Sequence, residues 1–396
     1  MKSRKNKLNQ KLITLISLIT ASLVLIILMI FIISLKKNNK NVYIAFYGIE
    51  KEYSSVIEEL FPKNDKIKYI VNVLEKGPVN YKTISKKYDL MFTWKGEVSD
   101  QLEGFAKDIP SKLNNFVPET IKNDKYLPLL LDNCELAYNK KSAEKFGGDL
   151  PIDFEGFTEY LSKTKDIVIS PFICNGNDDK ILSALIVNLI EKIGGIQAYK
   201  DFIDELKKGT DFNSLLSVKL GKKEITLNQI LLTLDEWNKK GFLFNGWYNI
   251  KENDLKFFVE EKQTAVLFTY LSSHRNFTWK IMNEYEAYLF PPAKDIEETG
   301  IIAPVICGML LSKKQSAKKI LEELFTKQSQ EFLSDNTKLA PVHVRARAYD
   351  KQAEDVRFWA AGTIGGALPD VYNAAFQTKP EEFSIFCENI RNFLIR

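Results

Sequence analysis

Residues 42–47 read VYIAFY, a short apolar run with the composition of a buried β-strand, and Gly48 ends it. The same kind of run returns at 67–74 (IKYIVNVL) and at 88–94 (YDLMFTW). Between the first two, apolar residues at 53–60 follow helical spacing, and another short helix precedes the third. A strand, helix, strand, helix, strand order predicts parallel β-α-β units, and therefore an α/β fold.

Outward from this unit the pattern becomes mostly helical. The α/β pattern stops near Gly147-Gly148 and resumes near Ala265, which predicts two lobes whose connections cross between them more than once. We expect the helix that starts near Asp178 to stop at Gly194-Gly195. The further predicted elements are helices at 178–193, 230–237, 320–333 and 383–393 and apolar strand-like stretches at 265–270 and 301–311.

Composition excludes several classes of protein. At about 150 residues per domain, 396 residues provide two to three domains. With 45% hydrophobic and 27% charged residues, the chain is neither a disulfide-stapled mini-protein nor disordered throughout. Residues 1–40 hold eight Lys or Arg and no acid, so 47 basic residues face 51 acidic ones in the body. That balance argues against a nucleic-acid binder.

An apolar segment near the N-terminus predicts one transmembrane helix. Residues 12–35 carry no charge, and at 1.5 Å per residue they extend about 36 Å, enough to cross a hydrocarbon core of roughly 30 Å. The segment is interpreted either as an uncleaved anchor or as a long signal peptide, and the length of the run favours the anchor. Since Cys134 is the first cysteine, a lipid anchor is not expected.

The flanking lysines predict the orientation of this segment. More positive charge precedes residue 12 than follows residue 35, which puts the N-terminus in the cytoplasm. We therefore expect a single-pass protein of the cytoplasmic membrane whose body lies on the periplasmic or extracellular side. Residues 1–40 then form the cytoplasmic stub, the anchor and a spacer, and the 11 residues ahead of the span are too few for a signalling domain.

The cysteines and histidines do not indicate a metal or cofactor site. The four cysteines lie far apart with no Cys-x-x-Cys pair, and only His274 and His343 could complete a zinc site. Cys174 and Cys307 have apolar neighbours, which favours small core residues over disulfides. We expect no metal and no cofactor.

A series of motifs follows a fixed order along the body: 128–140 (PLLLDNCELAYNK), 146–148 (FGG), 151–157 (PIDFEGF), 257–266 (FFVEEKQTAV), 290–293 (FPPA), 311–316 (LSKKQS) and 339–342 (LAPV). Together these motifs resemble a known family, the bacterial extracellular solute-binding proteins of the maltose-binding type, which are the family 1 substrate-binding subunits of ABC importers. The resemblance covers roughly residues 42–396. The chain departs from the family at Glu261, where the family has Gly, at Val266, where Met is usual, and in lacking the lipid-anchor cysteine.

The resemblance implies a two-lobed periplasmic-binding-protein fold with an interlobe cleft that closes by hinge motion. We place the N-terminal lobe at 41–145 plus 265–310 and the C-terminal lobe at 146–264 plus 311–396. The implied function is capture without catalysis: delivery of a small-molecule solute, expected to be a sugar or oligosaccharide, to ABC permease subunits in the membrane.

Ligand contacts are expected where parallel strands end and where aromatic and polar residues lie together. Sugars need rings for their C–H faces and paired donors and acceptors for their hydroxyls. The resemblance adds the residues ahead of the helix that opens near Asp178, although Asp178 is also a plausible N-cap. The predicted ligand-binding residues are Tyr47, Glu50, Trp94, Lys95, Asn175, Asn177, Asp178, Trp247, Tyr248, Tyr270, Arg275 and Trp359.

Two other readings stay open. A ligand-sensing subunit could use the same fold to contact a separate receptor. An anchored glycoside hydrolase would need two carboxylates about 5 to 9.5 Å apart. Adjacent acids such as Asp178-Asp179 point to different faces of a helix, and no Gly-x-Ser-x-Gly, His-Glu-x-x-His or phosphate-loop motif occurs, so a binding protein is favoured over an enzyme.

Overall fold

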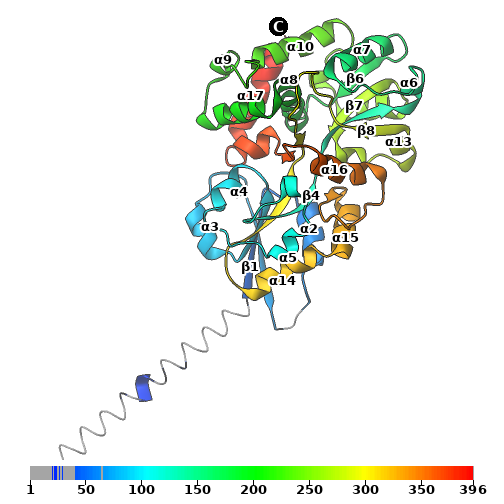
Figure 1. The fold of residues 1–396 in the computed structure, drawn as a ribbon. Coiled ribbons are helices and arrows are strands. Elements are labelled where there is room, and N and C mark those ends of the chain that lie inside the picture. The colour runs from blue at the N-terminus through cyan, green and yellow to red at the C-terminus, as the bar shows by residue number, and fades with distance from the viewer. Residues whose placement is uncertain are drawn as a thin grey trace, which may run out of the picture.

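Two β-sheets, one in each lobe, organise the chain (Figure 1). The structure is a computed structural model that describes residues 20, 22–24, 26, 29, 41–63 and 66–395. The mixed α/β, two-lobed architecture expected from the sequence is present.

The first lobe contains a six-stranded sheet in the order β11-β4-β10-β3-β1-β2. β1 pairs in parallel with both β2 and β3, which confirms the predicted β-α-β units. β10 pairs antiparallel with β3 and β4. The strands are β1 (Asn41–Tyr47), β2 (Lys68–Leu74), β3 (Leu90–Trp94), β4 (Leu127–Leu131), β10 (Val305–Leu310) and β11 (Ala340–Pro341).

Helices flank this first sheet. The predicted single helix over 320–333 is wrong, because the structure has two helices there, α14 and α15. The second one starts afresh at Thr326, whose hydroxyl accepts the Ser329 N–H as an N-cap. The helices are α2 (Lys51–Glu59), α3 (Tyr81–Lys87), α4 (Glu97–Leu102), α5 (Ser111–Asn114), η1 (Glu119–Ile121), α14 (Gln315–Leu324), α15 (Lys327–Thr337) and α16 (Lys351–Gly362).

The second lobe contains a four-stranded sheet in the order β6-β7-β5-β8. Its strands are β5 (Cys134–Asn139), β6 (Ser170–Cys174), β7 (Thr264–Tyr270) and β8 (Tyr285–Tyr288). A short parallel pair, β9 (Ile301–Ile302) with β12 (Ala367–Leu368), lies where the chain passes between the lobes.

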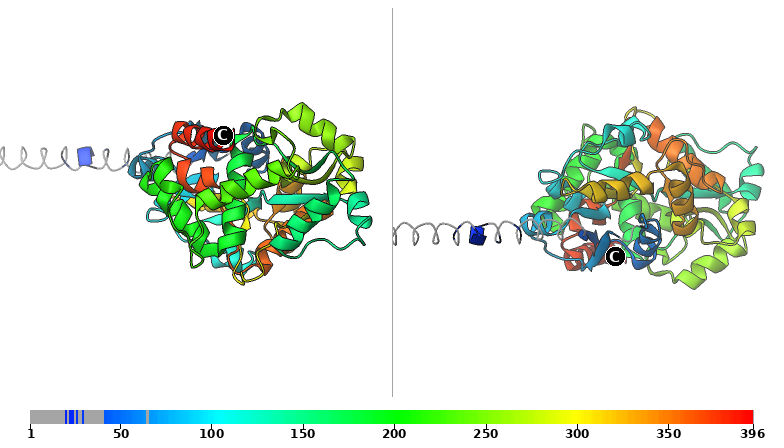
Figure 2. Two further views of the ribbon diagram at one scale, coloured as in Figure 1. Left: turned by 90° about the horizontal axis from the view of Figure 1, so that it is seen from above. Right: turned by 90° about the horizontal axis from the view of Figure 1, so that it is seen from below.

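The second lobe holds most of the helices. Figure 2 shows the C-terminal helix α17 against the helices drawn in green, in agreement with its contacts to α8 and α10. The helices are α6 (Lys140–Glu144), α7 (Phe154–Thr164), α8 (Asp179–Lys208), α9 (Phe212–Leu215), α10 (Leu227–Lys239), η2 (Trp247–Asn249), α11 (Glu252–Glu260), α12 (Leu271–His274), α13 (Trp279–Glu284), η3 (Tyr372–Phe376) and α17 (Pro380–Ile395).

Helix α8 is longer than predicted. Gly195 takes a non-helical conformation, with φ 81°, so the helix kinks there but resumes and ends at Gly209 in the left-handed region. Among the described residues it is the one helix long and apolar enough to cross a membrane, yet 83% of its apolar window is buried, as in a core helix. The predicted span at 12–35 lies almost entirely outside the described residues.

The predicted lobe boundaries need three corrections. β5 and α6, within the predicted first-lobe range 41–145, belong to the second lobe, because β5 pairs with β7 and with β8. Thr264–Tyr270 belongs to the second lobe, because β7 pairs antiparallel with β5 and in parallel with β6. The chain after Leu310 returns to the first lobe: Ile320 and Leu324 pack in the core that contains Val42 and Phe92. The passages between the lobes therefore lie after β4, before β10 and after α16.

The four cysteines are buried and free, as expected for small core residues. Cys134, Cys174 and Cys387 pack in the core of the second lobe, and Cys307 packs in a cluster of the first. Burial raises the pKa of each of these thiols, so the neutral form predominates.

Candidate ligand-binding site

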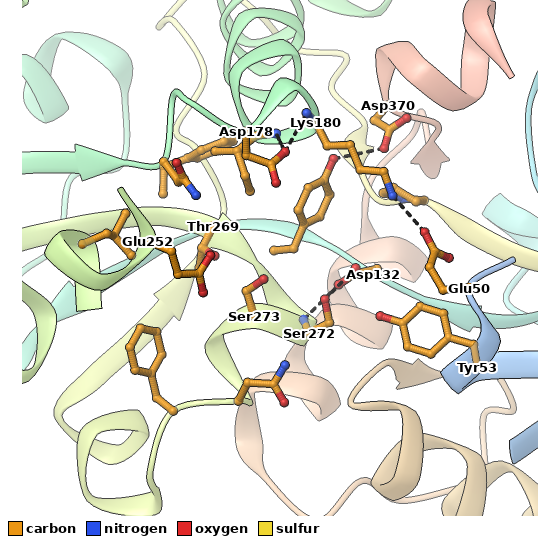
Figure 3. Close-up of a pocket in the computed structure, with 18 of the residues that line it drawn as sticks. Glu50, Tyr53, Asp132, Asp178, Lys180, Glu252, Thr269, Ser272, Ser273 and Asp370 are labelled. Atoms are coloured by element: carbon orange, nitrogen blue, oxygen red, sulfur yellow. Dashed lines mark hydrogen bonds and ion pairs between the residues drawn. The ribbon is translucent and has the colours of Figure 1, made fainter. Parts of the chain in front are cut away.

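A cavity of about 300 Å³ lies between the lobes (Figure 3). The first lobe contributes the segments after β1, β3 and β4, and the second contributes the start of α8, part of α11, the end of β7 with α12, and the segment around η3. The lining residues are Glu50, Tyr53, Trp94, Asp132, Asn175, Asp178, Lys180, Ile181, Glu252, Leu255, Lys256, Phe268, Thr269, Tyr270, Ser272, Ser273, Asn276, Phe277, Pro304, Asp370 and Asn373.

One ion pair crosses the cavity from lobe to lobe. The Lys180 ammonium lies 2.9 Å from Oε1 of Glu50, and the other oxygen, Oε2, accepts the indole N–H of Trp94 at 3.2 Å. Asp178 positions Lys180 by accepting its backbone N–H as the N-cap of α8. Burial by itself raises the pKa of Glu50, but the charge and hydrogen bond of Lys180 outweigh it, so the net pKa lies below the usual value.

Asp132 lies in the cavity on the first passage between the lobes. Its two oxygens accept the backbone N–H of Ser272 at 2.9 Å and the hydroxyl of the same residue at 2.8 Å. Burial raises the pKa of Asp132 to about 7, although these hydrogen bonds act in the opposite direction. The passage after β4 is therefore tied to the segment after β7 through a carboxyl group that can change charge near neutral pH.

Asp370 forms a second buried carboxylate on the opposite side. It accepts the backbone N–H of Asn373, within η3, at 2.8 Å and the hydroxyl of Tyr270 at 3.0 Å. Burial raises the pKa of Asp370, against the lowering effects of the Asn373 N–H and of Lys180. Figure 3 shows the side chain of Lys180 extending toward Glu50, with Asp370 beside it.

Aromatic rings lie beside these charged groups. Tyr53 meets Trp94 edge-on, with ring centroids 6.1 Å apart, in the first lobe, and Phe268 and Phe277 line the second. Rings next to carboxylates, hydroxyls and an ammonium suit a ligand with both C–H faces and hydroxyl groups. Across the described residues, no group of His, Cys, Asp and Glu is arranged to hold a metal ion.

The backbone is similar to those of solved bacterial binding proteins. The solute receptor AcbH, described as preferring β-D-galactopyranose, has a TM-score of 0.68 at 15% identity over 90% of this chain and 94% of that chain. A Bacillus subtilis binding protein in an open conformation has 0.66 at 12% identity, over 90% and 92%. The chain has the two-lobed fold of bacterial solute-binding proteins.

A further relative by structure is a Staphylococcus aureus extracellular solute-binding protein in complex with maltose, with a TM-score of 0.56 at 14% identity over 90% of this chain and 97% of that one. No family model matches the sequence, and no curated protein matches it. These solved neighbours are themselves receptors and binding proteins.

Within the solute-binding fold, part of the predicted set of ligand-binding residues lines the cavity. These residues are Glu50, Trp94, Asn175, Asp178 and Tyr270. The rule that ligands meet the carboxyl ends of strands accounts for Glu50, Trp94 and Tyr270, because β1, β3 and β7 all end at the cavity.

Three predicted residues from strand ends lie elsewhere, because their polar groups are used internally. Tyr47 is buried, and its hydroxyl donates to the carbonyls of Gly77 and Gln377. Lys95 donates to the carbonyl of Ala367. Arg275 is buried against the first lobe, where its guanidinium donates to Asp350 at 2.7 Å.

The remaining predicted residues also lie outside the cavity. Asn177 is exposed, and its carbonyl accepts from Arg391. Trp247 and Tyr248 pack with the core of the second lobe, where Trp247 is buried. Trp359 packs against the core of the first lobe. These aromatic residues pack against the protein core instead of lining the cavity.

Sequence reasoning missed much of the cavity lining. Tyr53 lies on α2, where its spacing indicated only a core face. Asp132 lies within the 128–140 motif, and Lys180 lies two residues after the predicted site residue Asp178. Both could have been found from these positions in the sequence. Glu252 and Asp370 carry no local signal, because only the packing of distant segments brings them to the cavity.

Proposed function

We propose that this protein captures a sugar or short oligosaccharide in the cavity between its lobes. The observation that carries the proposal is the mixed lining of that cavity, in which the rings of Tyr53, Trp94 and Tyr270 lie beside the carboxylates of Asp132 and Asp370. A volume of about 300 Å³ suits a ligand of one or two sugar rings.

The same geometry supports delivery of the solute to an ABC importer. A ligand that contacts both lobes favours the closed arrangement, and a membrane partner with different affinity for the two arrangements can distinguish loaded from empty protein. Passages at three places along the chain, after β4, before β10 and after α16, supply the hinge. The fold shared with solute receptors supports this reading.

We further propose that residues 12–35 anchor the protein in the cytoplasmic membrane, with the N-terminus inside and the body outside. The uncharged length and the flanking lysines support the anchor and its orientation. The described residues in this segment include Leu23, Val24 and Met29, which are helical with exposed apolar side chains. Retention in carbonate-washed membranes, with a protease-accessible body in spheroplasts, is the expected result.

Calorimetric titration of the full chain in detergent against a carbohydrate panel tests the capture step. We expect saturable heat with one ligand per chain and no new product by chromatography, and sustained product formation would indicate the hydrolase instead. Heat only with a polyamine, a metal chelate or a peptide contradicts the sugar assignment.

A matched pair of tryptophan variants locates the site. Trp94→Ala removes a cavity ring, so we expect a loss of affinity of roughly tenfold or more. Trp279→Ala removes a ring that is 53% exposed and lies outside the cavity, and it should leave affinity unchanged. Equal losses in both variants would place the ligand elsewhere.

A further inference from the structure

Lysines gather at the pole of the first lobe opposite the cavity. β1 and β3 end at the cavity, so their first residues, together with the start of β2 and the end of the antiparallel β10, lie at the far pole. Figure 1 shows α14 and the start of β1 together at this pole. We name as the basal patch the lysines at or beside these ends: Lys68, Lys86, Lys87, Lys107, Lys125, Lys313, Lys314, Lys318 and Lys319.

Contacts show that six lysines of the basal patch are close neighbours. One groove is lined by Lys313, Lys314 and Lys319, and a second by Lys313, Lys314 and Lys318 with Lys107 and Lys125. The N–H of Lys107 also donates to the carbonyl of Leu310 at the end of β10, at 2.7 Å.

Few acids offset this charge. Lys314 pairs with Asp89 and Lys125 pairs with Asp108, while Asp124 is a further exposed acid nearby. Within residues 41–63 and 66–395, no ion pair is recorded for Lys313, Lys318 or Lys319. The body as a whole carries more acids than bases, so the basal patch is a local concentration of charge and not a general excess.

The basal patch surrounds the point where the body joins the proposed anchor. The ammonium of Lys314 donates to the carbonyl of Asn41, the first residue of β1, at 3.0 Å. Five residues separate Asn41 from Leu35, and Lys36, Lys37 and Lys40 are among them. A fully extended chain from Leu35 to Asn41 spans about 20 Å, so the anchor would hold this pole close to the bilayer.

We propose that the basal patch binds the anionic phospholipid headgroups of the membrane in which the anchor lies, and so docks the base of the first lobe on the bilayer. This inference rests on the proposed anchoring. An anionic surface attracts nearby lysines within about a Debye length, roughly 8 Å at physiological salt. The short tether allows the basal patch to come within this distance of the bilayer, and its lysines supply the positive charge.

Energy transfer measures docking in the full chain. The four native cysteines are buried and free, so Ser316→Cys, within one of the grooves, provides a selective site for a donor dye. The labelled chain is placed in nanodiscs of phosphatidylcholine alone or with roughly 30% phosphatidylglycerol, each with an acceptor on the headgroups. We expect stronger transfer with phosphatidylglycerol, and a return to the neutral-lipid value in about 1 M NaCl, where the Debye length is about 3 Å.

Two triple variants separate the basal patch from general charge. Each lysine near an anionic surface raises the ratio of docked to undocked protein roughly fivefold. Lys313→Gln, Lys318→Gln and Lys319→Gln together should therefore lower this ratio about a hundredfold. Lys165→Gln, Lys200→Gln and Lys222→Gln change exposed lysines of the second lobe and should leave transfer unchanged. Thermal melting checks that each variant is folded.

The outcomes distinguish the two proposals. Equal energy transfer in neutral and anionic discs, or full energy transfer in the basal triple variant, overturns the docking proposal and leaves the anchoring proposal unaffected. Elution of the full chain apart from both kinds of disc overturns the anchoring, and this inference with it.

Discussion

Several ion pairs join the lobes, among them Asp100 with Lys207 and Glu286 with Lys351. Two others, at Arg275 and at Lys180, differ in nearly every physical respect. Arg275, after α12, contacts Asp350 at 2.7 Å, with both side chains only 3–4% exposed. The same guanidinium donates to the carbonyls of Ser334 and Leu339 in the first lobe. Lys180 and Glu50 meet at 2.9 Å in the cavity with 41% and 27% of their side chains exposed.

The difference assigns a separate role to each pair. A buried guanidinium with a carboxylate and two carbonyls cannot separate without leaving unpaired charge in the interior, so it keeps the lobes together at a fixed pivot. A partly exposed pair can open into water at little cost. Lys180 and Glu50 can therefore separate, and each can bind a polar group of the ligand instead.

Breaking the buried pair should have the largest effect. Arg275→Ala leaves Asp350 and the Leu339 carbonyl without their partner, and we expect the free energy of unfolding to fall by about 3–5 kcal/mol. Arg391→Ala is the control, since its pair with Asp179 is partly exposed and lies inside the second lobe, and it should cost about 1 kcal/mol. Urea unfolding followed by tryptophan fluorescence measures both, and similar losses would contradict the assigned roles.

Asp132 adds a pH-dependent element between the two pairs. Its pKa of about 7 in the folded chain exceeds the usual value of about 3.9, so the folded state binds the proton more tightly. Stability from this group is complete below pH 4 and is lost as pH rises through 7, a fall of about 2–4 kcal/mol. In Asp132→Asn this group no longer titrates, so the fall in unfolding free energy between pH 4 and pH 8 should be smaller by that amount. An unchanged pH dependence would argue against a buried, titrating carboxyl.

A close backbone contact between the lobes should have an intermediate effect. Gly96 has φ +145°, and a Cβ there would lie 2.0 Å from the Asn373 carbonyl oxygen. Gly96→Ala should therefore lower the unfolding free energy by about 1–3 kcal/mol. Gly104, just beyond α4, has open space around it, so Gly104→Ala should change stability by about 0.5 kcal/mol or less. Thermal melts of the two variants compare them, and equal shifts would show that the lobes do not meet tightly at Gly96.

The exposed pair should matter least for folding and more for binding. Lys180→Met should lower the unfolding free energy by about 0–1 kcal/mol. It also removes a charged donor from the cavity, so affinity for the solute should fall roughly tenfold. Parallel urea and calorimetric titrations measure the two effects, and a stability loss as large as that of Arg275→Ala would remove the distinction between the pairs.

Local patterns in the sequence were sufficient for most elements. The apolar runs at 42–47, 67–74 and 88–94 predicted β1, β2 and β3 to within a few residues. β1 and β3 lie inside the sheet, where a buried strand needs apolar side chains on both faces, whereas the edge strand β2 is only partly buried. The end of α8 and the break at Thr326 were missed, because kinks and caps depend on single residues rather than on periodicity.

Assignment of segments to lobes required the tertiary structure. Strand β7 reads like any buried strand, and only its hydrogen bonds to β5 and β6 place it in the second lobe. Arg275 and Tyr47 carried the same local signals as true cavity residues such as Glu50, yet their polar groups are satisfied inside the protein.

The sequence by itself determined the α/β class, the strands of the first sheet and an apolar N-terminal segment, since these depend on the composition of neighbouring residues. Only the tertiary structure decided that Asp132, Lys180 and Asp370 share one cavity and that lysines far apart in the chain meet at one pole. Those groupings depend on strand order and chain crossing, which bring together residues with no relation in sequence.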